Sequence, residues 1–185
     1  RRNHSSSKCL RQLARPICPE LACWCNKVMF FSGSLRSSLA CLATFGPIGH
    51  LRPAPGTIGS GIGVVSGYLV ASYSAGVLAV ATLLVTAIGI LAANAYSQTT
   101  GRKDAPEVII DEVAGQWIAL IILPLDLWWF VAAFILFRFF DITKIGLVGM
   151  AERLSGGVGV MADDIAAGLL TALCLWAAGQ IFFGF

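Results

Sequence analysis

The sequence predicts an all-α membrane protein, a polytopic bundle of about five apolar helices. Hydrophobic residues make up 57% of the 185 residues and the mean hydropathy is +0.78, whereas charged residues make up only 12%. Soluble domains typically contain about 25% charged residues. The apolar residues are also gathered in long blocks, as in membrane-spanning helices. We therefore expect the lipid bilayer to surround most of the folded chain.

The start of the chain differs in composition from the rest. Residues 1–36 contain seven basic residues and one acidic residue, whereas the remainder contains six basic and nine acidic residues. Five of the six cysteines lie in the first 41 residues, without a paired spacing typical of a zinc site. We predict that residues 1–39 form a basic, disordered extension and that residues 40–185 form the membrane domain. Because the basic residues lie in this loose extension, we expect no nucleic-acid partner.

A loop rich in Gly and Pro, residues 44–63, leads into the first apolar helix. Its three prolines and several glycines prevent a regular helix until about Thr57. The five apolar segments that follow are too long and too poor in turn residues for strands. The second and fifth are long enough for a full span of about 20 residues, and the other three are short. The segments are residues 58–73, 75–96, 108–123, 127–142 and 164–185.

Several glycines of the first segment indicate close contact with a neighbouring helix. They are Gly59, Gly61, Gly63 and Gly67.

The connecting loops predict the orientation in the membrane. The turns after the first and third segments contain no basic residue, whereas loops 97–107 and 143–161 contain four. Because Lys and Arg concentrate on the cytoplasmic side of membrane proteins, five spans with the start of the chain inside fit best. This threading places most acidic residues at the same side, including Asp104, and only Asp126 opposite. We therefore predict a catalytic rim on the cytoplasmic side.

Two adjacent carboxylates, Asp111 and Glu112, interrupt an otherwise apolar run. A buried, unpaired carboxylate costs several kcal/mol, and such residues in apolar segments normally face a polar cavity, a partner or a cation. Carboxylate oxygens without His or Cys favour Mg²⁺, which binds through a few carboxylates and leaves positions for phosphate oxygens. We expect the metal ligands to come from Asp111, Glu112, Asp141, Asp163 and Asp164.

Other interpretations of these residues stay open at this stage. Asp141 follows Arg138 by three residues, so the two side chains can form an ion pair without any catalytic role. One of Asp163 and Asp164 can cap the N-terminus of the last helix. On a helix, Glu112 shares a face with Gln116, which can orient its carboxylate.

Four motifs in order resemble the phosphatidylglycerophosphatase A family over about residues 40–185. They are Pro55-Gly56-Thr57-x-Gly59-Ser60, Asp104-x6-Asp111-Glu112-x2-Gly115-Gln116, Phe137-Arg138-x2-Asp141-Ile142-x-Lys144 and Gly156-Gly157-x-Gly159-x-Met161-x-Asp163-Asp164-x3-Gly168. The resemblance implies a Mg²⁺-dependent phosphatase of the bacterial inner membrane. It would convert phosphatidylglycerophosphate to phosphatidylglycerol and phosphate.

The resemblance also suggests roles for individual residues. We expect catalysis by Asp111, Glu112, Asp141 and Asp164, and binding of the substrate phosphate by Arg138, Lys144, Thr57 and Ser60. Since no Ser, Cys or His is placed as an obvious nucleophile, we favour attack by water, with an aspartyl-phosphate intermediate as the alternative.

Two other functions have to be weighed against this one. Another membrane phosphotransferase would also be rich in carboxylates, although the D-G-x2-A-R pattern of CDP-alcohol phosphotransferases is absent. A divalent-cation transporter would place acidic residues near the middle of the membrane, whereas the predicted topology places them at one edge. The sequence gives no oligomeric state.

Overall fold

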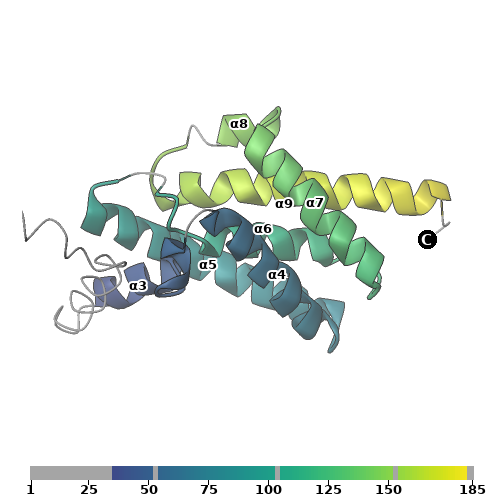
Figure 1. The fold of residues 1–185 in the computed structure, drawn as a ribbon, viewed down its shortest axis with the longest axis horizontal. Coiled ribbons are helices and arrows are strands. Elements are labelled where there is room, and N and C mark those ends of the chain that lie inside the picture. The colour runs from purple at the N-terminus through teal and green to yellow at the C-terminus, as the bar shows by residue number, and fades with distance from the viewer. Residues whose placement is uncertain (1–34, 52–53, 103–104, 152–153, 183–185) are drawn as a thin grey trace, which may run out of the picture. The chain divides into compact units, whose positions relative to one another are not determined.

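The structure is a computed structural model that describes residues 35–51, 54–102, 105–151 and 154–182 (Figure 1). These residues form one compact unit that begins at Leu35. They contain seven α-helices, one short 3-10 helix and no strand, which confirms the all-α prediction. The helices are α3 (Leu35–Ala43), η1 (Ile48–His50), α4 (Pro55–Ala71), α5 (Ala75–Thr100), α6 (Ile110–Leu120), α7 (Leu127–Thr143), α8 (Leu147–Ala151) and α9 (Gly156–Phe182).

The five predicted apolar segments correspond to α4, α5, α6, α7 and α9. Among the described residues, only α5 and α9 are long and apolar enough to cross a membrane, as their lengths in the sequence predicted. Helices α4, α6 and α7 have 17, 11 and 17 residues, fewer than the roughly 20 that a full span needs. The five-span arrangement therefore stays a prediction.

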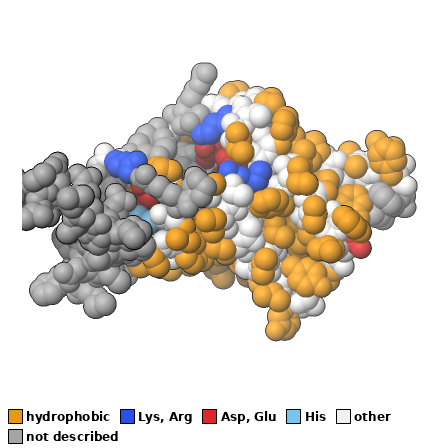
Figure 2. Space-filling model, viewed as in Figure 1, with side chains coloured by type: hydrophobic (Ala, Val, Ile, Leu, Met, Phe, Trp, Pro, Cys, Tyr) orange, Lys and Arg blue, Asp and Glu red, His pale blue; other side chains and the backbone are white. Residues whose placement is uncertain are grey.

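The outer surface of this unit is strongly apolar. Only 22% of the most apolar stretch of α5 and 33% of that of α9 is buried, whereas the core helix of a soluble protein would be mostly buried. Large side chains such as Leu83, Ile135 and Leu173 point outward. Figure 2 shows wide apolar areas on one face, with most of the charged side chains in the left half of the view. Exposed apolar surface on this scale marks contact with a membrane.

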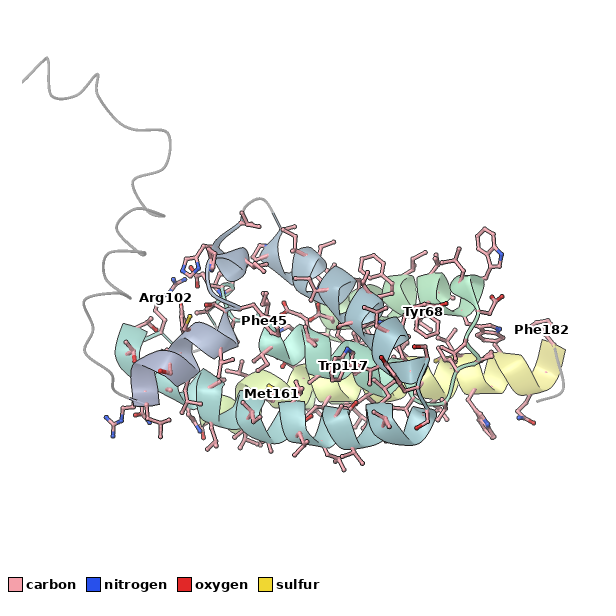
Figure 3. All side chains as sticks on the ribbon, turned by 90° about the horizontal axis from the view of Figure 1, so that it is seen from below. Phe45, Tyr68, Arg102, Trp117, Met161 and Phe182 are labelled. Atoms are coloured by element: carbon pink, nitrogen blue, oxygen red, sulfur yellow. The ribbon has the colours of Figure 1, made fainter. Side chains whose placement is uncertain are left out.

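Helix α6 lies at the centre of the unit and contacts α4, α5, α7 and α9. Nine of its 11 residues are buried. Val113, Trp117 and Leu120 pack in one apolar cluster with Phe130 of α7 and Leu175 of α9. Figure 3 shows Trp117 inside the bundle, where its indole Nε1–H donates to the Gly63 carbonyl oxygen at 2.9 Å. Because α6 is enclosed, its polar residues face the other helices.

Glycines of α4 allow it to pack closely against α6. A Cβ atom on Gly63 would lie 2.9 Å from the Cβ atom of Gln116, and one on Gly67 would lie 2.7 Å from Leu120 Cδ1. A Cβ atom on Gly59 would also meet α6 residues or their immediate neighbours, at 3.0–3.4 Å. These three glycines confirm the predicted close contact, but the prediction was wrong for Gly61, where a Cβ atom would meet nothing within 4 Å.

Helices α6 and α9 cross at a second pair of glycines. A Cβ atom on Gly115 would overlap the Asp164 carbonyl oxygen, and one on Gly168 would overlap the Gly115 carbonyl oxygen. Since both contacts are with backbone atoms, no side-chain movement can relieve them. The crossing therefore holds the backbone at Asp164 close to α6, which also carries Asp111 and Glu112.

The start of α9 corrects the sequence prediction. The helix begins at Gly156, not at residue 164, and the Gly157 backbone N–H donates to Asn94 Oδ1 of α5 at 2.5 Å. Asp163 and Asp164 consequently lie about two turns inside the helix, so the prediction that one of them caps it was wrong. The left-handed backbone at Gly156, with φ of +75°, lets the chain turn sharply into α9.

Two other boundaries also differ from the prediction. Helix α4 begins at Pro55 instead of Thr57, because proline at the first helical position lacks only an N–H that would have no partner there. Helix α3, which was not predicted, packs against α5. Of the predicted extension, residues 1–34 lie outside the described residues, as do Lys103, Asp104 and Arg153.

The glycine crossing generates a test by substitution. We expect Gly168→Ala to lower the free energy of unfolding by about 1–3 kcal/mol, because the new methyl group overlaps backbone. Gly61→Ala is the matched control in open space, and it should leave stability unchanged or raise it by about 0.5–1 kcal/mol. Thermal unfolding in detergent micelles measures both. Equal effects of the two substitutions would contradict the close crossing.

Candidate functional site

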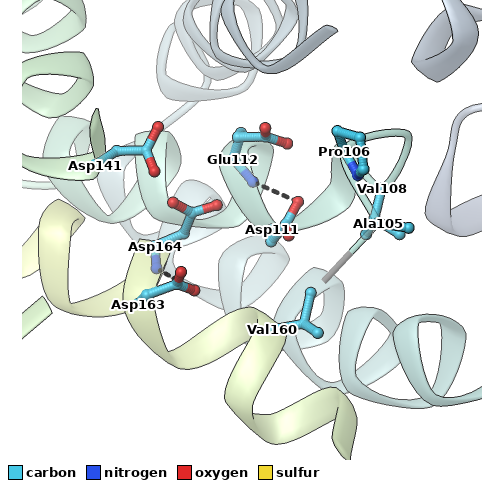
Figure 4. A pocket seen from close by; sticks show the side chains of 9 residues that line it. All are labelled: Ala105, Pro106, Val108, Asp111, Glu112, Asp141, Val160, Asp163 and Asp164. Atoms are coloured by element: carbon cyan, nitrogen blue, oxygen red, sulfur yellow. Dashed lines mark hydrogen bonds between the residues drawn. The ribbon is translucent and has the colours of Figure 1, made fainter. Parts of the chain in front are cut away.

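A cavity of about 140 Å³ lies at the N-terminal end of α6. Its polar wall is formed by side chains from α6, α7 and α9, and its apolar wall by residues of the loop before α6 and by Val160 (Figure 4). All five acidic residues that the sequence predicted as metal ligands line it. The lining residues are Ala105, Pro106, Val108, Asp111, Glu112, Asp141, Val160, Asp163 and Asp164.

Three of these acidic residues form a compact group. Asp111, Glu112 and Asp164 each contribute one carboxylate oxygen to a set whose members all lie within 4.8 Å of one another. Asp111 and Asp164 are only 8% and 4% exposed. Among the described residues, Glu112 Oε2 and Asp164 Oδ1 have no hydrogen-bond partner. Buried oxygens of like charge without donors are the arrangement that a divalent cation stabilises.

Asp111 and Glu112 lie in the first turn of α6, where Asp111 is removed from solvent. The positive end of the α6 dipole favours negative charge at this position. A cation in the cavity would likewise favour the ionised carboxylates.

The other two carboxylates of the cavity are paired with cations. Asp141 Oδ2 accepts a hydrogen bond from Arg138 Nη1, one turn earlier in α7. Asp163 Oδ2 lies 3.2 Å from Lys144 Nζ. The ion pair between Arg138 and Asp141 that the sequence left open is therefore formed. Each cation predicted to bind phosphate lies beside a carboxylate predicted to bind metal.

The backbone conformation of Lys144 directs its side chain toward the site. Lys144 ends α7 with a left-handed conformation, φ of +48°, which is uncommon for a residue other than glycine. Its backbone N–H donates to the Phe140 carbonyl oxygen at 2.9 Å. The turn brings the ammonium group to α9, next to Asp163.

The first turns of α4 make room for the site. A Cβ atom on Gly56 would lie 2.6 Å from Glu112 Oε1 and 3.1 Å from Arg138 Nη1, so these two side chains meet over this glycine. The fully buried Ser60 hydroxyl donates to the Gly56 carbonyl oxygen at 2.9 Å and accepts from Arg138 Nη1 at 3.5 Å. Thr57, which was predicted to bind phosphate, is exposed and does not line the cavity.

Some site residues were missed in the sequence. Gly56 was quoted in the first motif without a role of its own, although its spacing of four residues from Ser60 places both on one face of a helix. The apolar wall formed by Ala105, Pro106 and Val108 could not be recognised in the sequence. Only the path of the chain before α6 brings these three apolar residues to the cavity.

Comparison with known proteins agrees with this arrangement. The sequence model of the family described as Phosphatidylglycerophosphatase A matches residues 41–179, three quarters of the chain. The chain belongs to the phosphatidylglycerophosphatase A family. The match spans α4 to α9 and includes every acidic residue of the cavity. Membership makes the protein an enzyme, a phosphatase, as the sequence motifs predicted.

Individual relatives give the same picture of the phosphatidylglycerophosphatase A family. The proteins named "Phosphatidylglycerophosphatase A" of Escherichia coli and Haemophilus influenzae are 32% and 33% identical, over 68% and 78% of this chain and 74% and 90% of their own. A protein of Bacteroides thetaiotaomicron named "Putative phosphatidylinositol-3-phosphatase" is 39% identical over 68% of this chain and 86% of its own. No solved structure is significantly similar to the chain.

Substitution of one of the three clustered acidic residues tests whether their repulsion destabilises the metal-free protein. We expect Asp111→Asn to leave the metal-free protein as stable as the parent or more stable, because it removes one of three repelling buried charges. The control is Asp126→Asn, since exposed Asp126 caps α7 by accepting from the Trp128 N–H at 2.9 Å and Asn caps equally well. Thermal unfolding with and without Mg²⁺ measures both. An Asp111→Asn protein that is plainly less stable without metal would make Asp111 a structural residue.

Proposed function

We propose that this protein is a Mg²⁺-dependent phosphatase that hydrolyses phosphatidylglycerophosphate to phosphatidylglycerol and phosphate at the bacterial inner membrane. The observation that carries the proposal is the group formed by Asp111, Glu112 and Asp164, beside Arg138 and Lys144, in one cavity of an apolar helical unit. The names of the three relatives all denote phosphatases of phosphorylated phospholipids.

The donor set of the cavity fits Mg²⁺. Asp111, Glu112 and Asp164 would hold the ion, since they supply hard oxygen ligands and two of their buried oxygens have no hydrogen-bond partner among the described residues. No His or Cys is among the described residues that line the cavity, which disfavours zinc. Bound Mg²⁺ would activate a water molecule and neutralise charge on phosphate oxygens.

Arg138 and Lys144 would bind the substrate phosphate. A guanidinium group binds phosphate oxygens in a bidentate manner, whereas an ammonium group acts as a point charge. Asp141 and Asp163, which line the cavity, pair with these two groups and hold them beside it. Ser60 supports Arg138 from the side of α4. Thr57, exposed beside Gly56 in the first turn of α4, remains a predicted phosphate contact.

The reaction would be direct transfer of the phosphoryl group to water. Water oxygen forms the new bond to phosphorus, the bond between phosphorus and the glycerol oxygen breaks, and that oxygen takes up a proton. Glu112 or Asp164 would accept the proton of the attacking water through a carboxylate oxygen that does not hold the ion, and would return it to the leaving oxygen. Asp111 would hold the ion together with them, and Asp141 orients Arg138. Attack by an aspartate remains the alternative.

We expect phosphate release from phosphatidylglycerophosphate by the purified protein in detergent micelles, with activity lost on chelation and restored by Mg²⁺. Asp164→Asn should abolish the activity, and Arg138→Lys should lower kcat/KM by about 10- to 100-fold because the bidentate contact is lost. Asp126→Asn, at the far end of α7, should keep it. Release from phosphatidylinositol 3-phosphate alone would contradict the proposed substrate.

The site would face the cytoplasm in a five-span arrangement. The starts of α4 and α6, the end of α7 and the early turns of α9 all contribute to the site, whereas Asp126 and exposed Trp128 begin α7 at the other end. We expect single cysteines at Gln98 and Asp126, in a background without native cysteines, to be labelled from opposite sides of the membrane. Labelling of both from the same side would contradict this topology.

A further inference from the structure

Gln116 is a fully buried polar residue whose chemistry the proposed reaction does not use. Its side chain is fully buried in α6, between α6 and α4. Neither Oε1 nor Nε2 has a hydrogen-bond partner among the described residues. Its Cβ and Cγ atoms lie 2.9 and 3.2 Å from the point that a Cβ atom on Gly63 would occupy. The amide group is therefore held inside the bundle without a donor or acceptor to match it.

An amide group without a hydrogen-bond partner lowers the stability of the folded protein at this position. A buried polar group without a hydrogen bond destabilises the folded state, whereas methionine or leucine would fill similar space without that cost. Packing against Gly63 requires only the first two carbon atoms of the side chain. Packing alone thus gives no reason for the amide.

The position of Gln116 relative to Glu112 supplies a reason. The two residues are four apart in α6, so they lie on one face of the helix. Side chains on a helix lean toward its N-terminus, so the Gln116 amide leans toward Glu112. Both face α4, with Glu112 Oε2 3.2 Å from the point that a Cβ atom on Gly59 would occupy, one turn before Gly63. Oε2 is also the Glu112 oxygen without a hydrogen-bond partner.

We propose that Gln116 is a positioning residue for Glu112, whose Oε2 receives a hydrogen bond from the Gln116 amide through one water molecule. This contact orients the Glu112 carboxylate toward Asp111 and Asp164. The inference rests on the proposed function only where Mg²⁺ serves as the probe. Groups that hold metal ligands in place typically change metal affinity by about 10- to 100-fold when they are removed.

The first experiment measures Mg²⁺ binding to the full chain in micelles by calorimetry, without substrate. Gln116→Met, or Gln116→Leu if the methionine variant fails to fold, should weaken Mg²⁺ binding about 10- to 100-fold while the melting temperature of the metal-free protein stays equal or rises. The control is Thr82→Val, which removes another buried polar group, bonded to the Leu78 carbonyl oxygen of α5 at 2.7 Å. It should leave Mg²⁺ affinity unchanged. Unchanged affinity in the Gln116 variants would overturn the proposal.

A second measurement separates this inference from the proposed function. If the parent protein binds no Mg²⁺, the metal-dependent reaction is wrong, but a double-mutant cycle still decides the role of Gln116. The melting temperatures of Gln116→Met, Glu112→Gln and the double variant are compared without metal. We expect the effect of Gln116→Met to depend on whether Glu112 is present. Strictly additive shifts would show that the two side chains do not interact, and would overturn the proposal.

Discussion

Repulsion among buried carboxylates is the constraint on which this structure depends. Asp111, Glu112 and Asp164 come from two helices that the fold forces together, although their charges oppose that approach. The backbone contact of Gly115 with α9 and the glycines of α4 supply the packing that overcomes the repulsion. An enclosed α6 also removes the solvent that would otherwise screen the charges. The fold thus gathers buried carboxylates whose mutual repulsion a bound cation would relieve.

The two ion pairs of the cavity show how the remaining charges are arranged. Arg138 pairs with Asp141 and Lys144 pairs with Asp163. The two cations therefore lie beside the cluster of three buried acidic residues without neutralising it. A phosphate group carries several oxygens and can engage both cations while the acidic group faces a metal ion. The apolar wall beside Val160 gives the cavity a second surface of different character. A phospholipid is likewise divided into a charged headgroup and apolar chains.

The charged residues of the site could be predicted from the sequence because charge is rare in this chain. Asp111 and Glu112 stand out in an apolar run, and their helix appeared within two residues of the predicted start. The crossing partners could not be predicted, since the contact of Gly115 with Gly168 depends on how two distant helices meet. The start of α9 was misplaced because Gly156 and Gly157 suggest a loop, whereas the Asn94 side chain of α5 satisfies the first turn.

The most direct measurement of the metal site is anomalous diffraction from crystals of the protein grown with Mn²⁺, which occupies similar oxygen sites. The structure predicts one strong anomalous peak among the carboxylate oxygens of Asp111, Glu112 and Asp164. A peak located instead between Asp141 and Asp163, or no peak in the cavity at saturating Mn²⁺, would contradict the assignment of these three carboxylates as the metal ligands.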